Sequence, residues 1–442
     1  MMCPTIHKAD ELNQIDEQSN PCLYSIQRKV VLDNNLEILL PHAVELLACK
    51  IGDNILSVKF YNSIHHSLKI VLGVRVKPLD VYDWSTFRSH LKNILSSHMV
   101  VMFIPVAQSM RCETMSCRAA VLSNTFPPPV GIGASISAIG AERSGSLGAY
   151  FRLINPDNAT ETTVFLTASP TVVPNDNKET NTAIRSPCHK DIEALLLTEN
   201  KCLTYVKEQL RSTQDKVDLG GSTEDQKWLV NRLSRIEEIA KKIQSLELAS
   251  SHPRSVVIGN VLDTSTPGST GTKGSKMHWT VVKDSQDKTT VKNKRPDMDR
   301  AWRLEPRSIR YDIKCDYWEL GNLSYNQWIC FHGATSGVRS GYTNGMRTFV
   351  NGTYEIEGLA ADFPNMSDYY DEIPPTRILY SDKLNPLTED GDSGASIWDE
   401  EGDLVGLLWG DDTSGAFMTS IDEMVEDVKR KTGMDLEPIQ DE

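Results

Sequence analysis

The sequence predicts a mainly β protein that carries an inserted α-helical hairpin and is preceded by a small α+β domain. From about residue 130, short β-prone runs alternate with glycines, and closely spaced strands of this kind are typical of a sandwich or barrel. Between residues 191 and 248, two long segments with apolar residues at helical spacing interrupt that rhythm. Before residue 126, helical and strand-like runs are mixed, which favours an α+β domain.

Composition narrows the class of protein. A chain of 442 residues exceeds one average domain, so two or three domains are expected. A hydrophobic content of 39% and a charged content of 24% are typical of a soluble globular protein with a real core. The net charge of −14 argues against non-specific binding to nucleic acid or to anionic membranes. We expect no cofactor and no metal, because neither a phosphate loop nor a Cys/His metal spacing is present.

The sequence also predicts the cellular location of the protein. The first residues lack the apolar stretch of a signal peptide, and no run approaches the about 18 apolar residues of a membrane span. The nine cysteines form no CxxC pair and are interpreted as reduced thiols. We therefore predict an intracellular, cytoplasmic protein.

The N-terminal part is predicted to comprise a disordered tail over residues 1–20 and the α+β domain over 21–125. Strands are expected at Ile55–Tyr61, Leu68–Val76 and Val100–Val106, with a helix capped by Asp83 between the last two. Three prolines, Pro127–Pro129, mark the boundary because they can continue neither a helix nor a central strand.

Residues 126–442 are predicted to form the β domain. The expected strands are Ala134–Ile139, Gly148–Ile154, Thr162–Ala168, Ser255–Val261, Met277–Val282, Gln327–Phe331, Met346–Val350, Arg377–Tyr380, Ala395–Trp398 and Leu404–Trp409. A helical hairpin is expected over about residues 188–250, with its turn at Gly220-Gly221; it either packs onto the β domain or serves as a partner-binding arm. A charged, mobile loop is expected at about 283–300, and a terminal helix from Ser420 to Arg430.

The most informative motif is Gly391-Asp392-Ser393-Gly394. It places a hydroxyl between two glycines, which let the backbone turn sharply and let a substrate carbonyl approach main-chain N–H groups. The same run is also ordinary turn chemistry. Its meaning depends on whether the chain supplies a base for Ser393.

Several segments resemble the trypsin/chymotrypsin-like serine peptidases of the PA clan. Gly391–Gly394 with Leu404–Gly410 is similar to the nucleophile strand and the strand that follows it. Gly333–Gly337 is similar to the family's Gly-x-Thr-x-Gly strand, and Leu166–Pro170 to its Leu-Thr-Ala-Ala-His segment. The resemblance covers about residues 130–435, and it implies two packed six-stranded barrels with a cleft between them.

Carried over residue by residue, the resemblance implies a degenerate catalytic triad. Ser393 occupies the nucleophile position, and the N–H groups of Gly391 and Ser393 would hold the oxyanion. The base position falls on Pro170, which cannot accept a proton, and the orienting aspartate is replaced by His278. A substitute base would have to be His278 or, less directly, His189 at the start of the hairpin.

The resemblance also implies a peptide-binding cleft. Leu387 falls near the base of the specificity pocket and suggests an apolar pocket, while Trp409 and Gly410 lie on the strand that pairs with an extended peptide. We therefore predict a pseudoenzyme that binds a peptide or protein partner. One alternative is an active serine endopeptidase that uses Ser393 with a non-standard base such as His278. Another is a structural or interaction module of a different β fold in which the serine motif is a plain turn.

Overall fold

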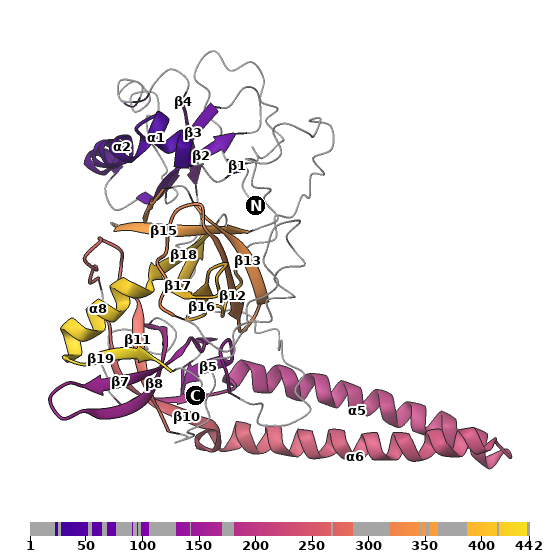
Figure 1. Cartoon of the computed structure of the whole chain (residues 1–442). Coiled ribbons are helices and arrows are strands. Elements are labelled where there is room, and N and C mark those ends of the chain that lie inside the picture. The colour runs from indigo at the N-terminus through magenta and orange to yellow at the C-terminus, as the bar shows by residue number, and fades with distance from the viewer. Residues whose placement is uncertain are drawn as a thin grey trace.

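The protein is mainly β over the part of the chain that the structure describes, as predicted. The computed structural model describes residues 23–24, 28–51, 55–63, 69–76, 91, 95, 99–105, 130–141, 143–169, 181–266, 268–285, 319–344, 346–350, 353–360, 387–412 and 415–439. Their strands form one 8-stranded and one 11-stranded sheet, and helices lie at the periphery (Figure 1).

The smaller sheet contains β5 (Ser135–Ala138), β6 (Gly145–Ser146), β7 (Tyr150–Asn155), β8 (Thr160–Ala168), β9 (Ala183–Arg185), β10 (Val257–Thr264), β11 (Trp279–Asp284) and β19 (Asp435–Pro438). The sheet curls into a ring because the segment that contains β6 and β7 pairs with a different strand at each of its ends. The start of this stretch, β6, pairs with β5, and its continuation, β7, pairs with β8. The remaining pairings, β8 to β11 to β10 to β9 to β5, complete the circuit.

The larger sheet contains a second ring, formed by β12 (Trp328–Gly333), β13 (Gly337–Thr343), β15 (Thr353–Ala360), β16 (Ser396–Trp398), β17 (Leu404–Asp412) and β18 (Gly415–Ser420). Strand β13 pairs with β12 on one side and with β15 on the other, which closes the path β12-β16-β17-β18-β15. Each sheet therefore supplies one curled, barrel-like layer.

The two rings share one hydrophobic cluster. Leu166 and Trp279 from the first ring belong to the same buried cluster as Trp398, Trp409 and Phe417 from the second. Burial of large aromatic side chains supplies much of the stability of such a contact. This shared core fixes the ends of β8 and β11 against the segment that carries Ser393.

The C-terminal helix links the rings a second time. Helix α8 (Ile421–Thr432) follows β18 directly and ends at Gly433, whose φ of 72° suits glycine, before the chain adds β19 to β7. The indole Nε1 of Trp279 donates a hydrogen bond to Asp427 Oδ2 on α8 at 2.8 Å. The helix predicted at Ser420–Arg430 is confirmed, with Ser420 at its N-cap.

The N-terminal part is α+β, and its strands join the larger sheet. It contains β1 (Leu23–Tyr24), α1 (Arg28–Asp33), α2 (Leu36–Ile51), β2 (Ile55–Ser63), β3 (Lys69–Val76) and β4 (Met99–Pro105). Strand β2 pairs with the short β14 (Thr348–Val350), which in turn pairs with β15. The buried Lys59 Nζ on β2 also lies 5.9 Å from the centroid of the Phe417 ring, within reach of a cation–π contact. The sheet of this N-terminal part is therefore hydrogen-bonded to the sheet of the second ring through β14.

Two long helices project from the first ring, between β9 and β10. Helices α5 (His189–Asp218) and α6 (Thr223–Ser251) lie side by side in opposite directions, and the 3₁₀ turn η2 (Pro253–Val256) returns the chain to β10 (Figure 1). Ser222 caps α6 through a reciprocal capping box. Lys242 Nζ lies 2.6 Å from the nearly buried Glu199 Oε1, an ion pair that ties the two helices together.

Most of the strands predicted from the sequence are present in the structure. The strands predicted near residues 55, 69, 100, 135, 150, 162, 257, 279, 328, 348, 396 and 404 are confirmed within a few residues. The predicted tail, the Asp83 helix, the Arg377–Tyr380 strand and most of the charged loop lie outside the described residues. Helix α2 was not predicted, because Pro41 lies within it, and β15 and β18 were also missed. Among the described helices, none is both long and apolar enough to cross a bilayer.

Candidate functional site

Ser393 lies on a tight turn that the two flanking glycines make possible. The N–H of Asp392 donates to Glu389 O at 3.0 Å, and the N–H of Ala395 donates to Asp392 O at 3.0 Å. Gly391 and Gly394 have φ values of 104° and 97°, which residues with a side chain rarely adopt. A Cβ on Gly394 would lie 2.3 Å from both Ser146 O and Thr167 Oγ1, so the turn presses directly against the first ring.

Asp392 holds this turn from within. Its carboxylate is fully buried and accepts hydrogen bonds from the N–H groups of Thr335 and Ser336 at 3.0 Å and of Glu389 at 2.8 Å. Burial raises the pKa of Asp392, and these hydrogen bonds oppose the rise. The carboxylate thus joins the turn to the β12–β13 connection.

The Ser393 hydroxyl is not activated by any described side chain. Its Oγ donates to the main-chain carbonyl of Trp409 at 3.3 Å, and the residue is partly exposed. A carbonyl oxygen can hold the hydroxyl but cannot remove its proton during attack, because it is far too weak a base. The Ser393 carbonyl accepts from Ser146 N at 2.8 Å.

His278 lies beside Trp409 and does not contact Ser393. The imidazole and indole ring centroids are 4.3 Å apart, with 31° between their planes. Its Nε2 is buried and has no hydrogen-bond partner among the described residues. Burial, with a smaller effect from Lys276, lowers the pKa of His278 to about 3. The residue as a whole is half-buried, but its imidazole packs on an indole and makes no contact with Ser393, so the structure does not show the Ser393–His278 dyad.

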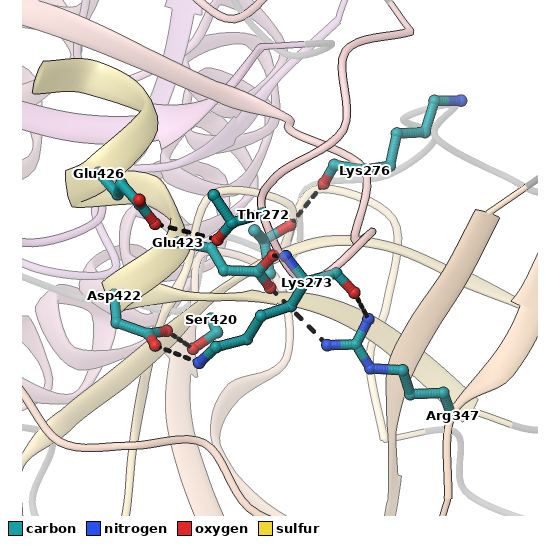
Figure 2. A network of polar contacts seen from close by, with 9 residues as sticks. Thr272, Lys273, Lys276, Arg347, Ser420, Asp422, Glu423 and Glu426 are labelled. Carbon is teal, nitrogen blue, oxygen red and sulfur yellow. Dashed lines mark hydrogen bonds and ion pairs between the residues drawn. The ribbon is translucent and has the colours of Figure 1, made fainter. Parts of the chain in front are cut away.

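The loop that places His278 is firmly anchored. Figure 2 shows residues 272–276 held against α8: Lys273 N donates to Glu423 Oε1 at 2.8 Å, and Thr272 Oγ1 donates to Glu426 Oε2 at 2.9 Å. Arg347, beside β14, lies 3.9 Å from Glu423 and donates to the Lys273 carbonyl. With its loop fixed at several points, His278 is positioned by the fold.

The chain just before the predicted base position lies next to the predicted acid position, His278. Ala168 at the end of β8 pairs with Trp279 at the start of β11, and Ser169 N donates to His278 O at 3.0 Å. Pro170 itself lies outside the described residues. The main chain of Ala168 also passes close to Gly394. The described residues therefore place the end of β8, His278 and the Ser393 turn close together.

The predicted substrate-binding residues are mostly buried. Leu387 is 4% exposed and packs in a cluster with core residues such as Phe331 and Leu408, so it does not line an open pocket. Trp409 is buried and stacks on Phe417, with ring centroids 5.6 Å apart. Gly410 pairs with Phe417 beside a bulge in β17.

Other candidates lie elsewhere or were missed. His189 Nε2 lies 3.3 Å from Glu193 Oε1 on the exposed surface of α5, so His189 pairs with a neighbour on its own helix and not with Ser393. Ser146 and Thr335 contact the turn directly and were not singled out from the sequence. Ser146 is separated from Gly391 by 245 positions, and no local signal marks such a contact. Within the described ranges, no group of three or more His, Cys, Asp or Glu could hold a metal ion.

Comparison with known proteins gives a structural similarity only. No protein-family model and no curated protein matches the chain. Solved structures similar to it include a glutamic acid specific serine protease (13% identity, TM-score 0.31, 70% of this chain and 100% of the protease). Thermobifida fusca Protease A (13%, 0.32, 70% and 99%) and Cellulomonas bogoriensis chymotrypsin (12%, 0.31, 71% and 99%) are also similar. Values this low establish neither activity nor specificity for this chain.

Proposed function

We propose that this chain is a serine-peptidase-like protein without peptidase activity that binds an extended peptide or protein segment beside Ser393. Its own topology supports the two-barrel assignment, since two closed rings of strands meet at the Ser393 turn. The observation that carries the loss of activity is the environment of His278. Its ring packs on Trp409, its Nε2 bonds to no residue that the structure describes, and Ser393 Oγ donates to the Trp409 carbonyl.

The expected loss of rate is large. In a serine peptidase of another fold, removal of the base alone costs about 10⁶ in turnover, and an oxyanion site without a triad retains about 10³ to 10⁴ over water. Proline at the base position excludes proton transfer to that side chain whatever its conformation. Hydrolysis would therefore be too slow to be the purpose of the protein.

The support for binding is an unpaired backbone edge next to the turn. On the side facing Ser393, pairing of β17 ends where Gly394 N donates to Leu408 O and Leu408 N donates to Ala395 O. On its other side, β17 continues to pair with β18 as far as Asp412. Beyond Trp409, whose carbonyl accepts from Ser393 Oγ, the backbone from Gly410 to Asp412 pairs with no described strand on this side, which suits strand addition by an extended peptide.

A fluorophosphonate probe tests the first half of the proposal. We expect labelling of the full chain no faster than labelling of its Ser393→Ala variant, with trypsin as positive control. Labelling at rates near those of trypsin, abolished in both Ser393→Ala and His278→Ala, would establish instead an active endopeptidase that uses His278.

Hydrogen exchange tests the second half. Addition of acetyl-trialanyl-leucine should slow exchange of the amides in residues 404–412 and leave those in β3, residues 69–76, unchanged. Equal exchange with and without the peptide, at concentrations up to several millimolar, would contradict a peptide-binding edge.

A further inference from the structure

The arm formed by α5 and α6 has a polar contact line in its middle part. Glu199 on α5 is nearly buried, and its carboxylate pairs with Lys242 on α6. Farther from the first ring, Arg232 on α6 donates to the Gln209 carbonyl and to Thr213 Oγ1 on α5. Polar side chains thus occupy positions along this line that apolar side chains take in most paired helices.

The apolar side chains of the same part of the arm lie beside that line. Four residues along an α-helix turn the direction of a side chain by about 40°. Leu203 follows Glu199 by four positions, and Ile236 follows Arg232 by four, so in antiparallel helices both turn toward the same face of the arm. We call it the leucine face, and it consists of Leu196, Leu203, Leu210, Leu229, Leu233 and Ile236. Leu233 is 50% exposed, and the other five are half-buried.

Exposed hydrophobic side chains concentrate on this arm. Among the described residues, seven of the nine large hydrophobic side chains that are exposed lie between His189 and Ser251. Figure 1 shows the arm extending from the first ring, away from the other described elements. Apolar surface exposed in this way marks a site of protein association.

The leucine face has the spacing of a surface that can pair with itself. Apolar residues recur every seven positions on each helix: Leu196, Leu203 and Leu210 on α5, and Leu229, Ile236 and Ile243 on α6. The two middle residues, Leu203 and Ile236, lie at the same level, because the two polar contacts across the arm bracket them at equal spacing. A two-fold axis through this level would therefore place Leu196 of one copy opposite Leu210 of the other.

The charges along α5 fit the same arrangement. Glu193 and Arg211 are eighteen residues apart, about five helical turns, so both lie on one exposed line along α5. Glu193 precedes Leu203 by ten positions, and Arg211 follows it by eight. In an antiparallel pair centred on Leu203, the Glu193 carboxylate of each copy therefore comes within reach of the Arg211 guanidinium of the other.

Net charge and area both favour association through the arm. Residues 189–251 carry ten Lys and Arg against eleven Asp and Glu, a net charge of −1 within a chain of −14. Arms about 45 Å long and antiparallel hold the acidic remainders of two copies far beyond the Debye length of about 8 Å. A face about 45 Å long and about 20 Å wide offers about 900 Å² per copy, and a stable interface needs about 800 Å².

We infer that this protein forms a two-fold dimer through the leucine face, in which the arms of two copies pack as an antiparallel four-helix bundle. The partner is a second copy of this chain, because the apolar spacing and the charges on α5 are both self-complementary. Dimerisation through the arm is independent of peptide binding beside Ser393.

Light scattering after size-exclusion chromatography tests the dimer with the full chain. We expect twice the chain mass of 49.4 kDa at about 10 µM protein. Leu203→Lys places two like charges at the two-fold axis, and Leu233→Glu buries a charge in the interface; each should weaken dimerisation by about 100-fold or more. Tyr205→Glu is the matched control, because Tyr205 is exposed on the opposite face of the arm; it should leave dimerisation unchanged.

An exchange of charges tests the antiparallel arrangement. Glu193→Arg and Arg211→Glu should each weaken dimerisation about tenfold, since each places like charges opposite one another twice in the dimer. The double variant with both substitutions should restore the affinity of the wild type. Circular dichroism checks that the helix content is unchanged in every variant; where Leu203→Lys lowers it, Leu233→Glu decides, because that side chain is already half-exposed.

Three outcomes would overturn the inference. A monomer at concentrations up to about 0.1 mM would leave the leucine face to a different protein. A dimer that persists in Leu233→Glu with unchanged helix content would place the interface elsewhere. A double charge variant that dimerises as weakly as the two single variants would rule out the antiparallel pairing of the arms.

Discussion

Gly394→Ala should destabilise the protein severely, because Gly394 is wedged between the two rings. An added Cβ would lie 2.3 Å from the carbonyl oxygen of Ser146 and 2.3 Å from Thr167 Oγ1, and it would be 3.1 Å from Ala168 N. Two of these three atoms belong to the backbone, so relief requires movement of β6 or β8. The φ of 97° adds strain for any residue with a side chain.

Gly433 provides a matched control for the magnitude. Its φ is 72°, but a Cβ there meets nothing within 4 Å. Gly433→Ala should therefore cost about 1 kcal/mol from backbone strain alone. Overpacking against a rigid backbone adds about 1–3 kcal/mol, so Gly394→Ala should cost about 3 kcal/mol or more.

Urea unfolding followed by tryptophan fluorescence measures both variants. We expect the midpoint for Gly394→Ala to fall well below that for Gly433→Ala, with unchanged slopes. If Gly394→Ala is no more destabilising than Gly433→Ala, the Ser393 turn does not press against the first ring. The reasoning on how that turn is positioned would then be wrong.

Three further predictions concern other parts of the chain. His278→Phe should keep the packing on Trp409 and make the free energy of unfolding less sensitive to acid. The folded-state pKa of His278, about 3, lies below the unfolded value, so the wild type should lose about 2–3 kcal/mol of stability as pH falls from 7 to 4. Urea unfolding across that pH range measures the difference. Trp279→Phe should cost about 1–3 kcal/mol, because it leaves the buried Asp427 carboxylate without its indole donor, and calorimetry would show this as a lower melting temperature. Ser222→Ala should cost about 1 kcal/mol of local stability in α6, visible as faster amide exchange in its first turn while β3 exchanges as before.

Much of the fold could be predicted from local patterns. The strands near Thr162–Ala168 and Leu404–Trp409 follow from β-branched and apolar runs between turn residues, and both are present as β8 and β17. The helical stripes between residues 191 and 248 follow from a period near 3.6, where the structure has α5 and α6. Helix α2 was missed, because a proline inside a helix contradicts the propensity on which such a prediction depends.

Some features of the candidate site could likewise be predicted from the sequence, and others could not. Ser393 between two glycines is evident in the sequence, whereas the assignment of Pro170 to the base position and His278 to the acid position, with the expected loss of chemistry, depends on the resemblance. The sequence did not indicate that Leu387 would be packed in the core, nor that Ser146 and Thr335 would hold the turn. It also did not indicate that β2 would pair with β14 and extend the second ring's sheet.

By itself, then, the sequence determined most of the segments that become strands and helices, and it placed Ser393 between two glycines. Those properties depend on neighbours a few residues apart, through side-chain period, backbone propensity and residue type. Only the tertiary structure decided that His278 packs on Trp409 and that the Trp409 carbonyl holds Ser393 Oγ. Each of these depends on contacts such as that of Ser146 with Gly391, 245 positions apart, which exist only once both rings have closed and packed in register.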